Sequence, residues 1–225
     1  MKGKVNLVET LSLYDLNFTF AEKYLKAFKY PWEALAGLKD YIISLGKTLN
    51  KSDFAEVLPN VWVHKSAEIS SAAHLGAPCI IGEETEVRHC AFIRGGAIVG
   101  RGCVVGNSTE LKNVILFDGV QAPHFNYVGD SILGHKAHLG AGAITSNVKS
   151  DKSPVSIKAE GQTINTGIKK LGAFVGDFVE VGCNSVLNPG TVIGKNTNIY
   201  PLSSVRGYIP ENSIYKGGGK ITAKK

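Results

Sequence analysis

The stretch "AFIRGGAIVGRGCVVGNSTEL", residues 91–111, repeats an apolar pair every six residues. Its larger aliphatic members are Ile93, Val99, Val105 and Leu111, and a small residue stands two positions before each of them. An α-helix has 3.6 residues per turn, so a period of six would scatter these positions around its axis. Two apolar positions separated by one residue fit a short strand that buries one face. The stretch therefore predicts short strands with a bend every six residues.

The same period continues on both sides of this stretch. Further aliphatic positions are Val63, Ile69, Leu75, Ile81 and Val87 before it, and Leu133, Leu139, Val175, Val181, Leu187, Ile193, Ile199 and Val205 after it. Three edges of six residues make a triangular coil, and coils stack at the spacing of neighbouring strands, about 4.8 Å. We therefore expect a mainly β protein, a parallel β-helix whose interior is filled in part by Cys79 and Cys103.

Residues 1–57 lack the repeat and are expected to form a short helical module. The segment 18–30, "FTFAEKYLKAFKY", places apolar residues at helical spacing. A second helix is predicted to begin at Pro31, which suits a first helical turn, and to stop at Gly46, which suits a C-terminal cap. We expect this module to pack on the β-helix or on a partner chain.

The β-helix is predicted to occupy residues 58–209, followed by a basic tail at 210–225. The repeat is interrupted at about 148–172, where a small hairpin is expected to turn at Glu160 and Gly161. This insertion is either a solvated surface loop, or a lid or subunit contact beside a functional site.

Composition narrows the class of protein. The 225 residues are 44% hydrophobic and 20% charged, and no apolar run approaches the roughly 20 residues that cross a bilayer. The start has no signal-peptide pattern, so we expect a cytoplasmic protein without a membrane partner. The four cysteines form no C-x-x-C pair, and no nucleic-acid motif is present. The net charge of +6 serves solubility or attracts an anionic ligand.

Arg94 and Lys112 are predicted to stack on neighbouring coils. Lys112 follows Arg94 after three repeats, which make one full coil, and each of the two follows an inward aliphatic residue, Ile93 or Leu111. Like charges on adjacent strands repel each other, so either both side chains extend into water or an anion lies between them. Arginine suits bidentate phosphate recognition and lysine suits a point-charge contact.

The segment "QAPHFNYVGD", residues 121–130, is interpreted as a break in the repeat. The six-residue register is lost after Leu111 and returns by Leu133, and Pro123 fixes the backbone just before His124. His124 is either a structural histidine or a general base that accepts a proton near pH 7.

Three motifs in the central region, "ELKN" (110–113), "PHFNYVGD" (123–130) and "GAGAITSN" (140–147), resemble those of a known family. The chain is similar to the hexapeptide-repeat acyltransferases. Within these it resembles the acetyltransferase domain at the C-terminus of the bifunctional enzymes that acetylate and then uridylylate glucosamine-1-phosphate. "GIKKLGAFVGD" (167–177) resembles the archaeal-type branch. The resemblance covers about residues 60–216, and it implies a left-handed β-helix and a homotrimer with active sites between subunits.

The resemblance also implies roles for individual residues. Arg94 and Lys112 match contacts to the sugar phosphate, and Tyr127 matches a substrate-binding tyrosine. His124 matches the catalytic base, and Asn147 matches an asparagine that contacts the acetyl group or the substrate.

Other matched positions concern acetyl-CoA and the sugar. Ala141, Cys183, Pro201 and Lys216 fall where the family contacts acetyl-CoA, with Cys183 in place of a serine. His138 stands where the bacterial enzymes have a substrate-binding asparagine. The implied activity is acetyl-CoA-dependent N-acetylation of an amino-sugar phosphate, with direct acyl transfer and no metal.

Some features leave other functions open. No glycine-rich nucleotide loop appears near the N-terminus, so nucleotidyl transfer is not expected despite the resemblance to pyrophosphorylases. The acceptor could instead be a nucleotide-linked amino sugar, or the solenoid could bind a sugar nucleotide without catalysis. His124, His135 and His138 could also be read as a metal site like that of γ-type carbonic anhydrases.

Overall fold

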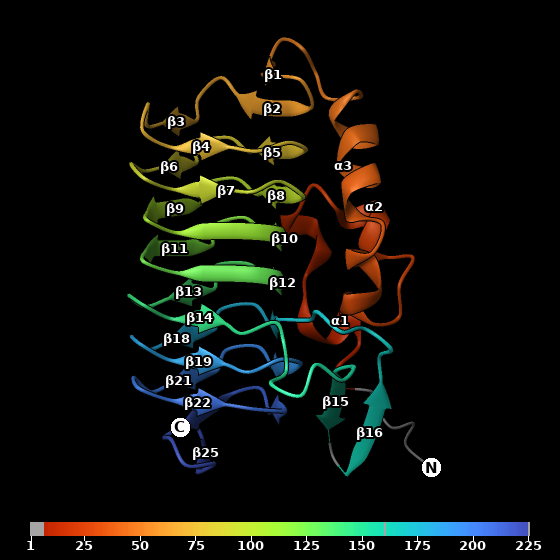
Figure 1. Cartoon of the computed structure of the whole chain (residues 1–225), viewed down its shortest axis with the longest axis vertical. Coiled ribbons are helices and arrows are strands. Elements are labelled where there is room, and N and C mark those ends of the chain that lie inside the picture. The colour runs from red at the N-terminus through yellow and green to blue at the C-terminus, as the bar shows by residue number, and fades with distance from the viewer. Residues whose placement is uncertain (1–6, 160, 225) are drawn as a thin grey trace.

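The computed structural model describes residues 7–159 and 161–224, and most of this chain is a parallel β-helix (Figure 1). The coils are triangular, and we name their three faces A, B and C. The chain runs from face B to face A and then to face C in each coil. The predicted mainly β, parallel β-helix with a short helical segment at its start is confirmed.

Face A consists of β4 (His74–Leu75), β7 (Phe92–Ile93), the first part of β10 (Glu110–Leu116), the first part of β12 (Tyr127–Leu133), β14 (Ile144–Thr145), β19 (Val186–Leu187) and β22 (Ser204–Val205). Face B consists of β3 (Glu68–Ile69), β6 (Glu86–Val87), β9 (Val104–Asn107), β11 (Gln121–His124), β13 (His138–Leu139), β18 (Glu180–Val181), β21 (Asn198–Ile199), β24 (Ser213–Tyr215) and β25 (Ile221–Ala223). Face C consists of β1 (Phe54–Leu58), β2 (Val61–His64), β5 (Cys79–Ile81), β8 (Ala97–Val99), the second parts of β10 and β12, β17 (Ala173–Val175), β20 (Thr191–Ile193) and β23 (Tyr208–Ile209).

The six-residue register is lost after Leu111 and restored at Leu133, as predicted. Leu111 pairs with Val128, and Leu116 pairs with Leu133, so each of these coils is one residue short of three full repeats. The missing residue is at the corner between faces A and C, where the steps from Leu111 to Leu116 and from Val128 to Leu133 are five residues long. The segment around Pro123 keeps its normal spacing. The break in residues 121–130 therefore begins at Val128 and does not include His124, so its placement at His124 is wrong.

His124 consequently occupies an ordinary corner of the coil. It closes β11, pairs with Asn107 of β9, and is followed by Phe125 in the left-handed region at φ 52°. The shortened corner instead carries Asn113 and Asp130, which have φ values of 55° and 48°. Asn and Asp tolerate this conformation better than other residues with a Cβ.

Face C is apolar on its outer side as well as on its inner side. The outward side chains are those of Trp62, Ile80, Ile98, Ile115, Ile132, Phe174 and Val192, and all of them are buried. The N-terminal module covers the upper part of this face, with helix α3 (Leu38–Gly46) against β5 and β8 (Figure 1). Burial of this apolar row supplies the driving force for docking, so the module packs on its own β-helix.

The module is less helical than predicted. Its elements are α1 (Thr10–Leu13), η1 (Leu16–Phe18), α2 (Glu22–Leu25), η2 (Pro31–Leu35) and α3, in which η denotes a 3-10 helix. The single helix expected from Pro31 to Gly46 is interrupted at Gly37. Gly46 ends α3 as predicted, but for another reason: a Cβ there would lie 2.2 Å from the indole of Trp62.

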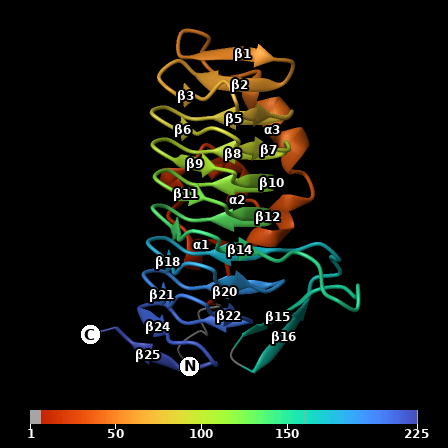
Figure 2. The same ribbon diagram turned by 60° about the vertical axis from the view of Figure 1, so that its left-hand side comes forward.

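The insertion forms the predicted hairpin. β15 (Ser156–Ala159) pairs antiparallel with β16 (Gln162–Asn165), and residue 160 lies outside the described part of the chain. The hairpin stands beside the lower coils, where β15 contacts β23 (Figure 2). Val155 and Ile157 are buried, so this part of the insertion packs against its surroundings, whereas most of its other described residues are exposed or half-buried. Within the described ranges, no helix combines the length and apolar character needed to cross a membrane.

Candidate active site

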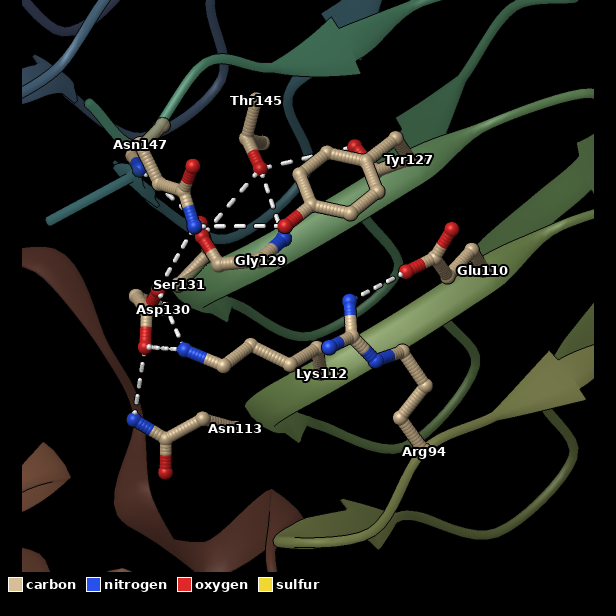
Figure 3. Close-up of polar contacts among 11 residues, drawn as sticks. Arg94, Glu110, Lys112, Asn113, Tyr127, Gly129, Asp130, Ser131, Thr145 and Asn147 are labelled. Carbon is tan, nitrogen blue, oxygen red and sulfur yellow. Dashed lines mark hydrogen bonds and ion pairs between the residues drawn. The ribbon is translucent and has the colours of Figure 1, made fainter. Parts of the chain in front are cut away.

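A buried carboxylate organises a polar cluster where face A meets face C (Figure 3). We name it the Lys112 cluster, and its members are Arg94, Glu110, Lys112, Asn113, Tyr127, Asp130 and Asn147. Asp130 Oδ1 accepts hydrogen bonds from Lys112 Nζ at 2.8 Å and Asn113 Nδ2 at 2.9 Å. Its Oδ2 accepts from Asn147 Nδ2 at 2.7 Å and again from Lys112 Nζ at 2.9 Å. The side chain of Asp130 is only 5% exposed, so these donors replace water almost completely.

The shortened corner brings these residues together. Lys112 pairs with Gly129 on the next coil, and Asn113 and Asp130 follow them directly. Gly129 has no side chain, so the lysine chain can cross it to reach Asp130. A Cβ at Gly129 would also lie 2.4 Å from the hydroxyl of Tyr127, so the glycine makes room for that ring.

Arg94 and Lys112 lie on neighbouring strands, as predicted from their spacing. Arg94 N donates to Leu111 O at 2.9 Å, and its guanidinium Nη1 donates to Glu110 Oε1 at 2.8 Å. The bond to Glu110 raises the pKa of Arg94. Each cation has its own carboxylate, so the two do not extend unpaired into water. The Arg94–Glu110 pair is partly exposed, and such pairs stabilise a fold only weakly, so an incoming phosphate can replace Glu110 at low cost.

Tyr127 closes the cluster on the side of face A. Its hydroxyl oxygen accepts from Asn147 Nδ2 at 3.2 Å. Burial raises the pKa of Tyr127, and the nearby carboxylates of Asp130 and Glu110 raise it further. The phenol is therefore protonated at neutral pH, and its O–H has no acceptor among the described residues. It is available to donate to a ligand.

The corner between faces B and A carries a second set of predicted residues. Gly142 N donates to His124 O at 3.0 Å, Asn184 N to Ala141 O at 2.8 Å, and Leu202 N to Cys183 O at 2.9 Å. The accepting residues, His124, Ala141 and Cys183, therefore lie above one another on successive coils. The stack, continued by Pro201, is named the corner row.

His124 is exposed at the upper end of the corner row. Buried Asn126 fixes its turn: Oδ1 accepts from His124 N at 3.1 Å, and Nδ2 donates to Gly140 O and Ala143 O. Within residues 7–159 and 161–224 the imidazole has no hydrogen-bond partner. It is free to meet a substrate.

The predicted acetyl-CoA positions follow His124 down the corner row. Cys183 and Pro201 lie on the next two coils. Each stands two residues after a member of the pair Val181 and Ile199, so the two are aligned on neighbouring strands. Lys216 directly follows β24, the last strand stacked on β21. From Ala141 to Lys216 this makes three steps, or about 14 Å of continuous surface parallel to the solenoid axis.

His138 lies apart from the Lys112 cluster. It is on β13 of face B, and its Nδ1 lies 2.7 Å from Glu180 Oε2. Faces A and B meet at the corner row, so His138 and Tyr127 point to different sides of it. One chain alone does not bring His138 to the other predicted substrate residues.

The alternative metal site is wrong. His135 is 8% exposed, its Nδ1 lies 2.8 Å from Asp118 O, and its ring stacks on Phe18 at 3.8 Å. It therefore serves to hold the N-terminal module against the β-helix. In the part of the chain that the structure describes, no three His, Cys, Asp or Glu side chains gather as metal ligands.

Sequence reasoning missed Asp130, Glu110 and Asn113. Asp130 stands one position short of a full coil from both Asn113 and Asn147, so a regular coil of three repeats does not align the three side chains. The available signal was the pair of five-residue steps between inward aliphatic residues, which shows where the coil is shortened.

Comparison with known proteins finds relatives that match nearly the whole chain. No protein-family model matches it. A bifunctional sugar-1-phosphate nucleotidylyltransferase/acetyltransferase of Sulfurisphaera tokodaii is 28% identical over 222 residues, which cover 96% of this chain and 55% of that protein. The bifunctional protein GlmU of Methanococcus maripaludis strain C5 is 30% identical over 234 residues, covering 100% of this chain and 56% of GlmU.

The chain is homologous to the C-terminal part of GlmU-type proteins. It spans about half the length of these GlmU-type relatives. Solved structures with a similar chain path include the polySia-specific acetyltransferase NeuO, with 14% identity, a TM-score of 0.43 and coverage of 70% of this chain and 82% of NeuO. The acetyltransferase domain of PglB from Neisseria gonorrhoeae with acetyl coenzyme A has 15% identity and a TM-score of 0.37, covering 72% and 56%.

Proposed function

We propose that this chain transfers an acetyl group from acetyl-CoA to the amine of an amino-sugar phosphate, with glucosamine-1-phosphate as the acceptor. The observation that carries the proposal is the meeting of two sets of residues on adjoining surfaces. The corner row presents His124, Ala141, Cys183 and Pro201 on successive coils. The Lys112 cluster lies on the neighbouring face A. The name of the Sulfurisphaera tokodaii relative, which includes an acetyltransferase, supports acetyl transfer.

The Lys112 cluster is suited to the phosphate of the acceptor. Arg94 and Lys112 are adjacent and already oriented by Glu110 and Asp130, so little side-chain entropy is lost when an anion binds. Asn147 donates to the Tyr127 hydroxyl oxygen, which leaves the Tyr127 O–H as a neutral donor beside the two cations. A sugar ring above Gly129 then extends along face A towards the corner row.

His124 is assigned as the general base. Its imidazole accepts a proton from the sugar amine as the nitrogen attacks the thioester carbonyl of acetyl-CoA. The C–N bond forms, the C–S bond breaks, and the thiolate of CoA leaves and takes up the proton. Acetyl-CoA is expected to lie along the corner row from Ala141 to Lys216, where exposed backbone and small side chains border it.

We also propose that the working form is a homotrimer with sites between subunits. Face C is covered by the chain's own N-terminal module and hairpin, whereas faces A and B are not. His138 and Glu180 on face B of one subunit would then complete the site on face A of the next. This arrangement accounts for the separation of His138 from Lys112 within one chain.

A panel of acceptors tests the proposal. Purified protein is incubated with acetyl-CoA and glucosamine-1-phosphate, glucosamine-6-phosphate, glucosamine or UDP-glucosamine, and CoA thiol release is measured. We expect glucosamine-1-phosphate to have the highest kcat/KM, and Lys112→Met to raise its KM while leaving the KM of glucosamine unchanged. Absence of thiol release with every acceptor would contradict the proposed enzyme activity.

A further inference from the structure

A small basic cavity lies between the hairpin and the last coils, away from the cluster at Lys112. It has a volume of about 180 Å³ and is lined by Lys149, Val155, Ser156, Lys158, Pro189, Gly190, Arg206 and Gly207. Three of these residues are cationic, and none is acidic. The insertion that supplies much of the wall has five lysines and only two acidic residues between 148 and 172.

Among the described residues, few negative charges lie beside the cations of this cavity. Arg206 Nη2 donates to Asn188 Oδ1 at 3.0 Å, which leaves most of its N–H donors unused. Neither Arg206 nor Lys158 forms an ion pair with a described residue. Lys149 lies 3.5 Å from Asp151, whose side chain is 62% exposed. By contrast, each cation of the Lys112 cluster has a carboxylate within 2.8 Å.

The wall of the cavity is held in place by packing. Ile157 and Val155 of the hairpin are buried, and a Cβ at Gly190 would lie 2.7 Å from Val155. Asn188 Nδ2 donates to Ser204 Oγ and Val205 O, so its oxygen must face Arg206. The contact with Asn188 therefore orients the Arg206 guanidinium, which lowers the cost of binding an anion there.

We propose that this cavity is a binding site for a phosphoryl or diphosphoryl group, separate from the acceptor phosphate site at Lys112. Sites that enclose a whole small ligand have volumes of roughly 300 Å³ or more, so this smaller cavity suits one charged group of a longer molecule. Arginine and lysine together are the residues that bind phosphate through directed and point-charge contacts.

The position of the cavity supports a ligand that extends along face A. Arg206 and Lys112 belong to one outward row of face A and lie four strands apart. The row consists of Lys112, Gly129, Ser146, Asn188 and Arg206. Four steps are about 19 Å, too far for one sugar phosphate to bridge. Arg206 also lies on the same coil as Pro201 of the corner row, across the width of face A. The phosphoryl group can come from the acyl donor or from a nucleotide-linked acceptor.

Inorganic pyrophosphate is the first probe, because its binding does not depend on the proposed acetyl transfer. Calorimetric titration is carried out on the wild type and on Lys158→Met, Arg206→Met and Lys65→Met. Lys65 is an exposed lysine on the first coil, so its loss changes the net charge equally. We expect Lys158→Met and Arg206→Met each to weaken pyrophosphate binding about tenfold, and Lys65→Met to leave it unchanged. Circular dichroism confirms that each variant is folded.

The source of the group is then identified with CoA, dephospho-CoA, which lacks the 3′-phosphate, and UDP. A loss in Lys158→Met seen for CoA but not for dephospho-CoA assigns the cavity to that phosphate of the donor, and an equal loss for both assigns it to the diphosphate. A loss confined to UDP assigns it to a nucleotide-linked acceptor.

The proposal is overturned if the wild type does not bind pyrophosphate, or if folded Lys158→Met and Arg206→Met bind all four probes as the wild type does.

Discussion

Asp130 accepts more side-chain hydrogen bonds than any other residue of the Lys112 cluster. Four hydrogen bonds from Lys112, Asn113 and Asn147 converge on its carboxylate, which is almost fully buried. A buried carboxylate is stable as an anion only when charged or polar donors surround it. Asp130 therefore holds Lys112 and Asn147 in place before any ligand arrives, and it keeps the local charge near zero.

A double-mutant cycle tests this coupling. Lys112→Met should lower the free energy of unfolding by about 2 kcal/mol, because it removes a charged hydrogen-bond partner from a buried carboxylate. Asp130→Asn keeps the side-chain size and the tolerance for positive φ. In the double variant the loss should be smaller than the sum of the single losses by at least about 1 kcal/mol in urea unfolding at pH 7. Strictly additive losses would show that the pair is not coupled.

The adjacency of Arg94 and Lys112 followed from the six-residue period alone, because both precede the shortened corner. The carboxylate partners of these cations did not follow from the period. Asp130 lies beyond a five-residue step, so a fixed period places it one position out of line. Side-chain pairing of this kind depends on the local coil length, which must be read at each corner.

Among the elements, the helices of the N-terminal module are positioned by the apolar face C on which they pack. Face C has an outward apolar row that recurs once per coil, and α3 and η2 lie on it. Trp32 of η2 packs edge-on against Phe174 at 5.7 Å, and Gly46 lets α3 approach the indole of Trp62. The bounds Pro31 and Gly46 were readable from the sequence. The interruption at Gly37 was not, because it depends on docking to a surface that the helical pattern does not describe.

Gly46→Ala tests the close approach of α3. The added methyl would overlap the indole of Trp62, so we expect a loss of about 2 kcal/mol in the free energy of unfolding. Ser44→Ala, an exposed change in the same helix, should alter it by less than about 0.5 kcal/mol. Chemical unfolding of both variants under identical conditions measures the difference. Equal stability of the two would show that α3 does not depend on this contact.

At the scale of the whole molecule, the β-helix is a continuous stack of buried rows, and its interior includes two thiols. Burial raises the pKa values of both Cys79 and Cys103 to about 12. In the unfolded chain these thiols ionise near pH 9. The period of six was sufficient to place both cysteines inside, because the inward rows follow directly from the repeat.

Alkaline pH should therefore destabilise the fold through these thiols. Between about pH 9 and pH 12 the unfolded state releases the two protons while the folded state keeps them, so the free energy of unfolding falls as pH rises. Replacement of both by alanine should make the fall over this range shallower, even though the variant is less stable at pH 7. Thermal unfolding at a series of pH values gives both slopes. Parallel slopes would contradict the assignment to the thiols.

The most direct test of the account is the turnover of acetyl-CoA with glucosamine-1-phosphate by the wild type, His124→Ala and His89→Ala. His89 is also an exposed histidine at the corner between faces B and A, two coils above His124, so it is a matched control. We predict that kcat falls at least about 100-fold in His124→Ala and stays within about twofold in His89→Ala, with unchanged thermal unfolding in both. Turnover of His124→Ala equal to that of the wild type would contradict the assignment of His124 as the base.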